Sequence, residues 1–150
     1  MNLIGKIVEL FTGYMKELRN NVQKYFISRA EIDSVIPKKL KYFEMVDMVY
    51  YTCDYKTMKK VCKLIPSRLR KYKADDWDCD NYAWQFKAIV QELFPKLPIG
   101  YVHADTLAGK HAMNCAVYLF NGNPKFVYIE PQTGLMYSQI QGTKPELILI

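Results

Sequence analysis

Cys79 stands at the start of a segment whose apolar residues recur at helical spacing. Counting forward from it, this stripe comprises Ala83, Phe86, Ile89 or Val90, and Leu93. Asp76 and Asp78 precede the cysteine as candidate N-caps. The free amide groups and the positive dipole end of a helix start favour a thiolate over a thiol. The pattern predicts an acidic, nucleophilic cysteine at the mouth of a buried helix.

Two residues far along the chain could complete a nucleophilic site with this thiol. Residues 111–120 alternate as a strand does, Asn121-Gly122 is a strong hairpin turn, and residues 125–130 form the return strand. With that turn, Val117 faces Phe126, and His111 shares a face with Glu130, within reach of its carboxylate. His111 would then accept the thiol proton while Glu130 orients the ring. His103, the other histidine, is the alternative base.

Composition limits the classes of protein that fit the chain. With 150 residues, half of them apolar, and a net charge of +6, it is long enough for a real core and attracts anions. We expect a single domain over 1–150, with a helical, basic part at 1–70 and a Cys-His-Glu core at 71–150. No run approaches the roughly 20 apolar residues that span a bilayer.

The other three cysteines indicate a reducing compartment. Cys53, Cys62 and Cys115 show no CxxC spacing with one another or with Cys79, and each lies in an apolar or helical pattern. Neither a zinc site nor a disulfide framework is indicated. Reduced, inert core thiols in a cytoplasmic protein are the simplest interpretation.

The elements that must position these residues change character along the chain. Residues 2–26 form an amphipathic helix that packs on the core or, alternatively, binds a partner or a membrane surface. Residues 29–41 read as a connection, 41–53 fit helix or strand with helix preferred, and 56–64 form a short helix ended by Pro66. Strands are expected at 99–104, 111–120, 125–130, 135–140 and 147–150. A helical half followed by an antiparallel β-meander predicts an α+β fold.

Positive charge is concentrated upstream of the cysteine segment. The basic residues between 38 and 73 are Lys38, Lys39, Lys41, Lys56, Lys59, Lys60, Lys63, Arg68, Arg70, Lys71 and Lys73. They form a solvated face or, alternatively, a docking surface for an anionic partner.

Three short motifs suggest a family. The order Cys79-Asp80-Asn81-Tyr82-Ala83, His111-Ala112-Met113-Asn114 and Ile129-Glu130-Pro131-Gln132-Thr133-Gly134 resembles the papain-like cysteine protease domain at the C-terminus of the fairy-ring-mushroom agglutinin type. The similarity covers about residues 70–140. It implies a papain-like (transglutaminase-like) fold with Cys79 as nucleophile, His111 as base, Glu130 as orienting acid and Gln132 as a further polar group. The lectin domain of that family has no counterpart here.

Members of that family are activated by calcium, which gives the acidic cluster a role. The residues with suitable oxygen atoms are Asp75, Asp76, Asp78, Asp80 and Asn81. Helix capping and dipole pairing are the alternative roles of this cluster. No cofactor other than calcium is expected.

The resulting hypothesis is a papain-like cysteine peptidase that acts on a protein or peptide substrate through an acyl-thioenzyme. One alternative is a non-catalytic papain-like module that binds an acidic protein or nucleic acid. Another is a thiol deamidase or transglutaminase, because water or an amine resolves the same intermediate.

Overall fold

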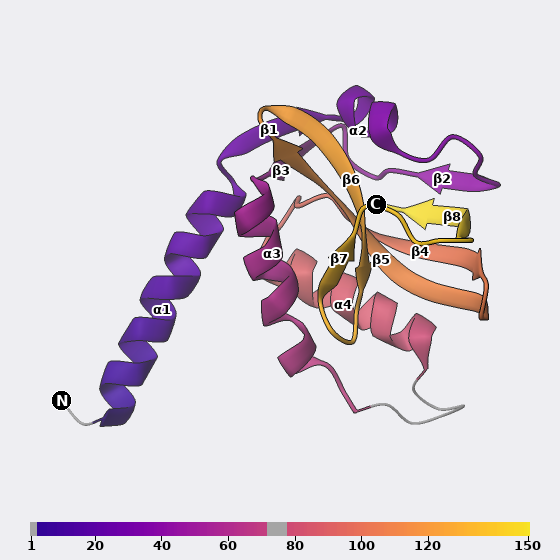
Figure 1. Ribbon diagram of the computed structural model, residues 1–150. Coiled ribbons are helices and arrows are strands. Elements are labelled where there is room, and N and C mark those ends of the chain that lie inside the picture. The colour runs from indigo at the N-terminus through magenta and orange to yellow at the C-terminus, as the bar shows by residue number, and fades with distance from the viewer. Residues whose placement is uncertain (1–2, 72–77) are drawn as a thin grey trace.

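The computed structural model describes residues 3–71 and 78–150, and its centre is a six-stranded sheet (Figure 1). The strands lie in the order β2-β8-β4-β5-β6-β7. Their bounds are β2 Tyr42–Glu44, β4 Ile99–Thr106, β5 Gly109–Phe120, β6 Asn123–Glu130, β7 Leu135–Tyr137 and β8 Lys144–Leu149. All neighbouring pairs are antiparallel except β2 and β8, which are parallel.

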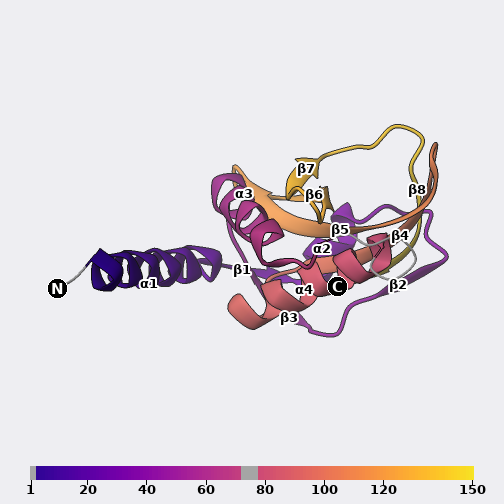
Figure 2. The same cartoon turned by 90° about the horizontal axis from the view of Figure 1, so that it is seen from below.

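Helices and a second, two-stranded sheet surround this centre. The helices are α1 Leu3–Val22, α2 Arg29–Val35, α3 Tyr55–Leu64, the short 3₁₀ helix η1 Pro66–Arg68, and α4 Cys79–Leu93. Strands β1 Tyr25–Ser28 and β3 Val49–Thr52 pair with each other. In both views the N-terminal end of α1 projects away from the rest of the molecule, while its C-terminal half, from Phe11 onward, lies against it (Figures 1 and 2).

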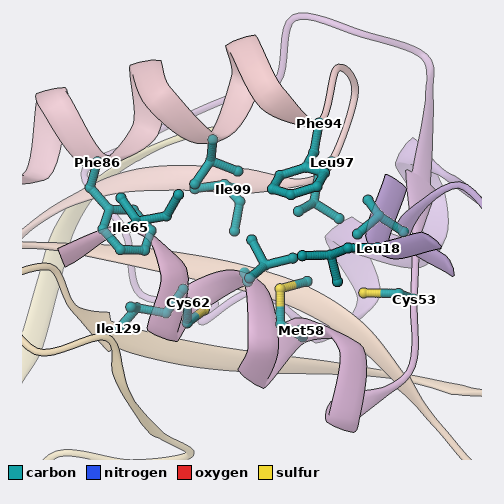
Figure 3. Close-up of a cluster of buried hydrophobic side chains, with 14 of the residues drawn as sticks. Leu18, Cys53, Met58, Cys62, Ile65, Phe86, Phe94, Leu97, Ile99 and Ile129 are labelled. Atoms are coloured by element: carbon teal, nitrogen blue, oxygen red, sulfur yellow. The ribbon is translucent and has the colours of Figure 1, made fainter. Parts of the chain in front are cut away.

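The core has two main parts, one on each face of the central sheet. On one face Ala116 of β5 packs with residues of α3 and α4, among them Met58 and Phe86 (Figure 3). On the other face Cys115 and Val117 of β5 pack with residues of α2 and the small sheet. Because both faces of β5 are covered, most of its central residues are buried rather than alternately exposed.

The hairpin between β5 and β6 forms as the sequence predicts. Asn121 and Gly122 both have positive φ angles, 51° and 77°, as the tight hairpin turn requires. Val117 lies opposite Phe126. The predicted register is therefore confirmed.

The helices predicted at 2–26 and 56–64 are confirmed as α1 and α3, but the segments between them differ from the prediction. Residues 41–53, for which helix was preferred, contain β2 and β3 instead, and residues 29–35 form α2 rather than a connection. Ser28 and Glu31 begin α2 with a capping box, in which each side chain binds the backbone of the other residue. The sheet is not a simple meander either, since β8 returns to lie between β2 and β4.

Asn114 fastens α4 to the sheet. Its side chain is fully buried, and its amide nitrogen donates to the Ala83 carbonyl of α4 at 2.9 Å and to the Gly100 carbonyl of β4 at 3.0 Å. Gly100 allows a close approach here, because an added Cβ would lie 2.6 Å from the Cys115 sulfur. One amide group therefore holds a helix and two strands together.

We expect Asn114→Ala to lower the free energy of unfolding by about 1–3 kcal/mol, since two buried carbonyls lose their shared donor. Chemical denaturation followed by circular dichroism measures this loss. Asn123→Ala is the control, because Asn123 donates only to the exposed turn carbonyl of Asn121. It should change stability by no more than about 0.5 kcal/mol. Equal losses in the two variants would contradict the role of Asn114.

Glu146 of β8 lies among basic side chains from three other segments of the chain. Its carboxylate accepts hydrogen bonds from Lys41 and from Lys110, the latter at 3.0 Å, and lies 3.5 Å from Nδ1 of His103. The bonds from Lys41 and Lys110 lower the pKa of Glu146 to about 2. The carboxylate is thus stabilised in the folded protein.

A lowered pKa in the folded state gives stability that is present above the ordinary value of 4.5 and is lost as pH falls towards 2. We therefore expect Glu146→Gln to reduce stability at pH 7, with a difference from the native protein that shrinks steadily below about pH 4.5. Denaturation curves between pH 7 and pH 2.5 test this. A difference that does not change with pH would contradict it.

Candidate functional site

Cys79 is the first residue of α4, as the sequence predicts. The Asn81 side chain accepts a hydrogen bond from the Asp78 backbone N–H at 3.4 Å, which closes the first turn behind the cysteine. The thiol is half-buried between α4 and the sheet, against Ala83, Tyr101 and Ala112. The helix start therefore directs the sulfur to the sheet rather than to open solvent.

The sulfur occupies a place that a neighbouring strand leaves open. The register of β5 with β6 would put Pro131 opposite Ala112, but β6 ends at Glu130. The Ala112 N–H, left without a partner on β6, donates to Sγ of Cys79 at 3.5 Å. Ala112 directly follows His111, so the thiol is held one residue from the predicted base.

His111 and Glu130 meet as the shared face predicts. Nε2 of His111 lies 3.1 Å from Oε2 of Glu130. The two side chains are 30% and 27% exposed, respectively. The other carboxylate oxygen, Oε1, accepts from the Gln132 backbone N–H at 3.3 Å. Gln132 thus contacts this pair through its main chain, while its side chain is exposed. The carboxylate is held from two sides.

A groove of about 490 Å³ opens beside this pair. Its walls include His111 and Glu130, with Met113 at the base and Thr106, Tyr137 and Ile140 around them. A molecule in this groove would contact the imidazole directly, within a mixed polar and apolar lining.

The remaining thiols and the second histidine are occupied elsewhere. Burial raises the pKa of Cys62 and of Cys115 to about 12 and raises that of Cys53 further. All three are buried, as the interpretation of inert core thiols requires. His103 lies beside Glu146 of β8. Of the four cysteines, all of which the structure describes, Cys79 alone has an accessible surface.

The predicted calcium ligands are only partly described. Asp75 and Asp76 lie outside the described residues. Asp78 and Asp80 share a side-chain hydrogen bond, which raises the pKa of Asp78 and lowers that of Asp80. Within residues 3–71 and 78–150 no group of three or more His, Cys, Asp or Glu side chains is arranged to hold a metal ion. Calcium binding stays a prediction.

The basic segment is spread over several elements. Lys38 and Lys41 form ion pairs with Asp33 and Glu146. Along α3 the exposed basic residues are Lys56, Lys59, Lys60 and Lys63. An anionic partner at this surface stays a prediction. No helix in the described part of the chain is both long and apolar enough to cross a membrane.

Sequence reasoning gave no role in the site to three residues near the thiol, one of which, Trp84, it interpreted as a packing residue. Tyr101 of β4 belongs to the cluster that Cys79 packs against, and Trp84 of α4 stacks on the Tyr101 ring with centroids 4.4 Å apart and planes 12° apart. Burial, with the nearby charges of Asp80, Cys79 and Asp78, raises the pKa of Tyr101. Asn114, the amide that binds α4, is the third. A single polar residue within an otherwise apolar strand was the sequence feature that could have indicated a structural role for Asn114.

Comparisons with known proteins return matches of structure only. Neither a known family nor a characterised protein matches the sequence. A structure described as "PSL1a-E64 complex" matches with a TM-score of 0.67 and 19% identity, over 85% of this chain and 52% of the other. Polyporus squamosus lectin, bound to "human-type influenza-binding epitope Neu5Aca2-6Galb1-4GlcNAc", matches with a TM-score of 0.66 and 21% identity, over 85% and 50%. The chain spans about half the length of these proteins, with which it shares a fold.

These matches correct the assignment made from three short motifs. One of the matching structures is named as a lectin, and neither is named as a papain-like protease. On these comparisons the papain-like domain, the α+β papain-like fold class and the cysteine peptidase are wrong, as are the binding-module, deamidase and transglutaminase alternatives. What the structure supports is a mixed helix-and-sheet chain with a six-stranded sheet. The single domain and the cytoplasmic location stay predictions.

Proposed function

We propose that the chain carries a reactive-thiol site in which Cys79 is the nucleophile, His111 the base and Glu130 the carboxylate that orients it. Two hydrogen bonds support this proposal. The Ala112 N–H donates to the sulfur of Cys79, and the ring of the preceding residue, His111, is hydrogen-bonded to Glu130. The proposal concerns the chemistry of the thiol and names no natural substrate.

The hydrogen-bonding capacity of the groups assigns the proton positions. An ionised carboxylate only accepts hydrogen bonds. Nε2 of His111 therefore carries a hydrogen atom and donates a hydrogen bond to Glu130. Nδ1 is then the basic nitrogen that takes the proton from the thiol of Cys79. The sulfur attacks an electrophilic carbon, a bond from that carbon to its leaving group breaks, and Glu130 stabilises the imidazolium.

Two further features support the proposed site. Cys79 begins a helix of 15 residues, whose N-terminal amide groups and dipole stabilise a negative charge. The Gln132 N–H fixes the free oxygen of Glu130, which limits rotation of the carboxylate. We include the Gln132 side chain in the site as a polar group at its rim.

Alkylation by iodoacetamide tests the site, because the thiolate displaces iodide from a simple electrophile. Near neutral pH we expect Cys79 to be labelled well before the three buried cysteines. His111→Ala should slow this labelling about tenfold or more and Glu130→Gln by a smaller factor, whereas His103→Ala should leave it unchanged. Peptide mass spectrometry over time gives the rate at each cysteine.

Two results would contradict the proposal. One is equal slow labelling of all four cysteines in the folded protein. The other is an equal effect of His111→Ala and His103→Ala. E64, the compound named with PSL1a, is a second probe, and we expect it to add to Cys79 in a one-to-one ratio in the native chain and not in Cys79→Ser.

A carbohydrate partner is the second candidate function. Polyporus squamosus lectin is described with a bound sialylated trisaccharide, and exposed aromatic rings provide flat surfaces on which sugar rings can stack. Trp84 is 47% exposed and is fixed by its stacking on Tyr101. Tyr101 in turn belongs to the buried cluster that Cys79 packs against.

Calorimetric titration with the trisaccharide Neu5Acα2-6Galβ1-4GlcNAc tests this candidate. We expect binding that Trp84→Ala weakens at least tenfold, because the exposed ring supplies the stacking surface. Phe120→Ala is the control, since Phe120 is similarly exposed, at 53%, on the distant β5–β6 turn. No heat of binding, or equal losses in both variants, would remove the candidate.

A further inference from the structure

One side of helix α1 is exposed to solvent and carries both charged and apolar side chains. Met15, Leu18 and Val22 of α1 are buried against the rest of the molecule. At about 100° per residue, Lys6, Leu10, Gly13 and Glu17 fall on the opposite side of the helix and are exposed. We call these four residues the outer face.

This face is hollowed rather than convex. A groove of about 610 Å³ runs along it, lined by Lys6, Glu9, Leu10, Gly13, Tyr14 and Glu17. Gly13 makes the hollow, since nothing lies within 4 Å of the position that its Cβ would take. Leu10, by contrast, is 74% exposed and stands beside the hollow. The helix therefore carries a projecting side chain at Leu10 and open space at Gly13.

We propose that the outer face pairs with the outer face of a second copy of this chain, with the two helices antiparallel and a two-fold axis between residues 11 and 12. In this register Lys6 of each copy comes level with Glu17 of the other. Leu10 comes level with Gly13 at the same time, where the missing side chain lets the helices approach closely. Each favourable pairing occurs twice, as a two-fold interface requires.

The body of the molecule leaves room for this arrangement. It packs on the side of α1 that carries Met15, Leu18 and Val22, opposite the outer face. The projecting helix is open along most of its length in both views (Figures 1 and 2). A second helix can therefore run alongside α1 without meeting the sheet of its own or the other copy.

The charges favour a second copy over a membrane surface. The groove carries one lysine and two glutamates, Glu9 and Glu17, so it has no attraction for an anionic lipid headgroup. Lys6 and Glu17, at the two ends of the outer face, are costly to place against acyl chains but are satisfied by their counterparts in a second copy. The exposed apolar residues along one edge of the outer face, such as Leu3 and Tyr14, add contact area.

Charge reversal tests the register. We expect the native chain to dimerise reversibly, and Lys6→Glu or Glu17→Lys alone to raise the dissociation constant about tenfold or more, because like charges then face each other twice. The double variant, Lys6→Glu with Glu17→Lys, should restore the native value. Sedimentation equilibrium over a hundredfold concentration range measures all four proteins.

A mixture of the two single variants makes the test specific for contact between copies. In the Lys6→Glu variant positions 6 and 17 are both negative, and in the Glu17→Lys variant both are positive, so the heterodimer recovers two opposite pairs. We expect the mixture to associate more tightly than either variant alone. Lys125→Glu, a reversal of an exposed charge on β6, is the control and should dimerise as the native chain does.

Several outcomes would overturn the proposal. The native chain could remain monomeric throughout the range, the mixture could associate no better than its components, or Lys125→Glu could weaken association as much as Lys6→Glu. Flotation of a monomeric chain with phosphatidylcholine and phosphatidylserine vesicles, lost in Leu10→Asp, would assign the helix to a membrane surface instead.

Discussion

The buried amide of Asn114 is the interaction on which the position of α4 depends. It binds one carbonyl of the helix and one of β4, from a strand position that is fully buried. A helix packed on a sheet by apolar contacts alone can slide, because dispersion contacts have little directionality. Two hydrogen bonds to fixed carbonyls remove that freedom. The start of α4, and with it Cys79, is therefore set relative to the β5 strand.

The end of β6 matters as much as the start of α4. If β6 continued past Glu130, its backbone would pair with Ala112 and the sulfur of Cys79 would have no donor there. The turn at 131–134 prevents this, and the N–H groups of Thr133 and Gly134 close it onto the Glu130 carbonyl. Gly134 is required in this turn, since its φ is 68° and a Cβ would lie 2.1 Å from the Cys62 carbonyl oxygen of α3. Packing of the turn on α3 thus protects the opening that the thiol occupies.

Local rules account for the parts of the fold that the sequence predicts. The start of α4, the Asn121-Gly122 turn and the shared face of His111 and Glu130 each follow from periodicity over a few residues. The Ser28 and Glu31 capping box obeys a local rule too, and its spacing would have revealed α2. Strands β2 and β3 do not, because β2 pairs with β8 about 100 residues later. The apolar run at 42–51 is compatible with helix until that distant partner is known. The same limit applies to Asn114, whose two acceptors come from separate elements.

The short motifs that suggested a family describe where Cys79, His111 and Glu130 lie on their helix and strands, and they do not by themselves identify a family. A cysteine at a helix start, a histidine on the facing strand and a glutamate at the end of the next strand describe how three elements meet, and that meeting is found in the structure. A reaction also requires a substrate surface, which short motifs do not encode. Here the two candidate surfaces share α4: its first turn presents Cys79 towards the sheet, and the next turn presents Trp84 towards solvent. Trp84 stacks on Tyr101, which belongs to the small cluster that Cys79 packs against. The proposed thiol site and the proposed sugar surface therefore use different sides of one helix, so a substitution in either can be tested without removing the other.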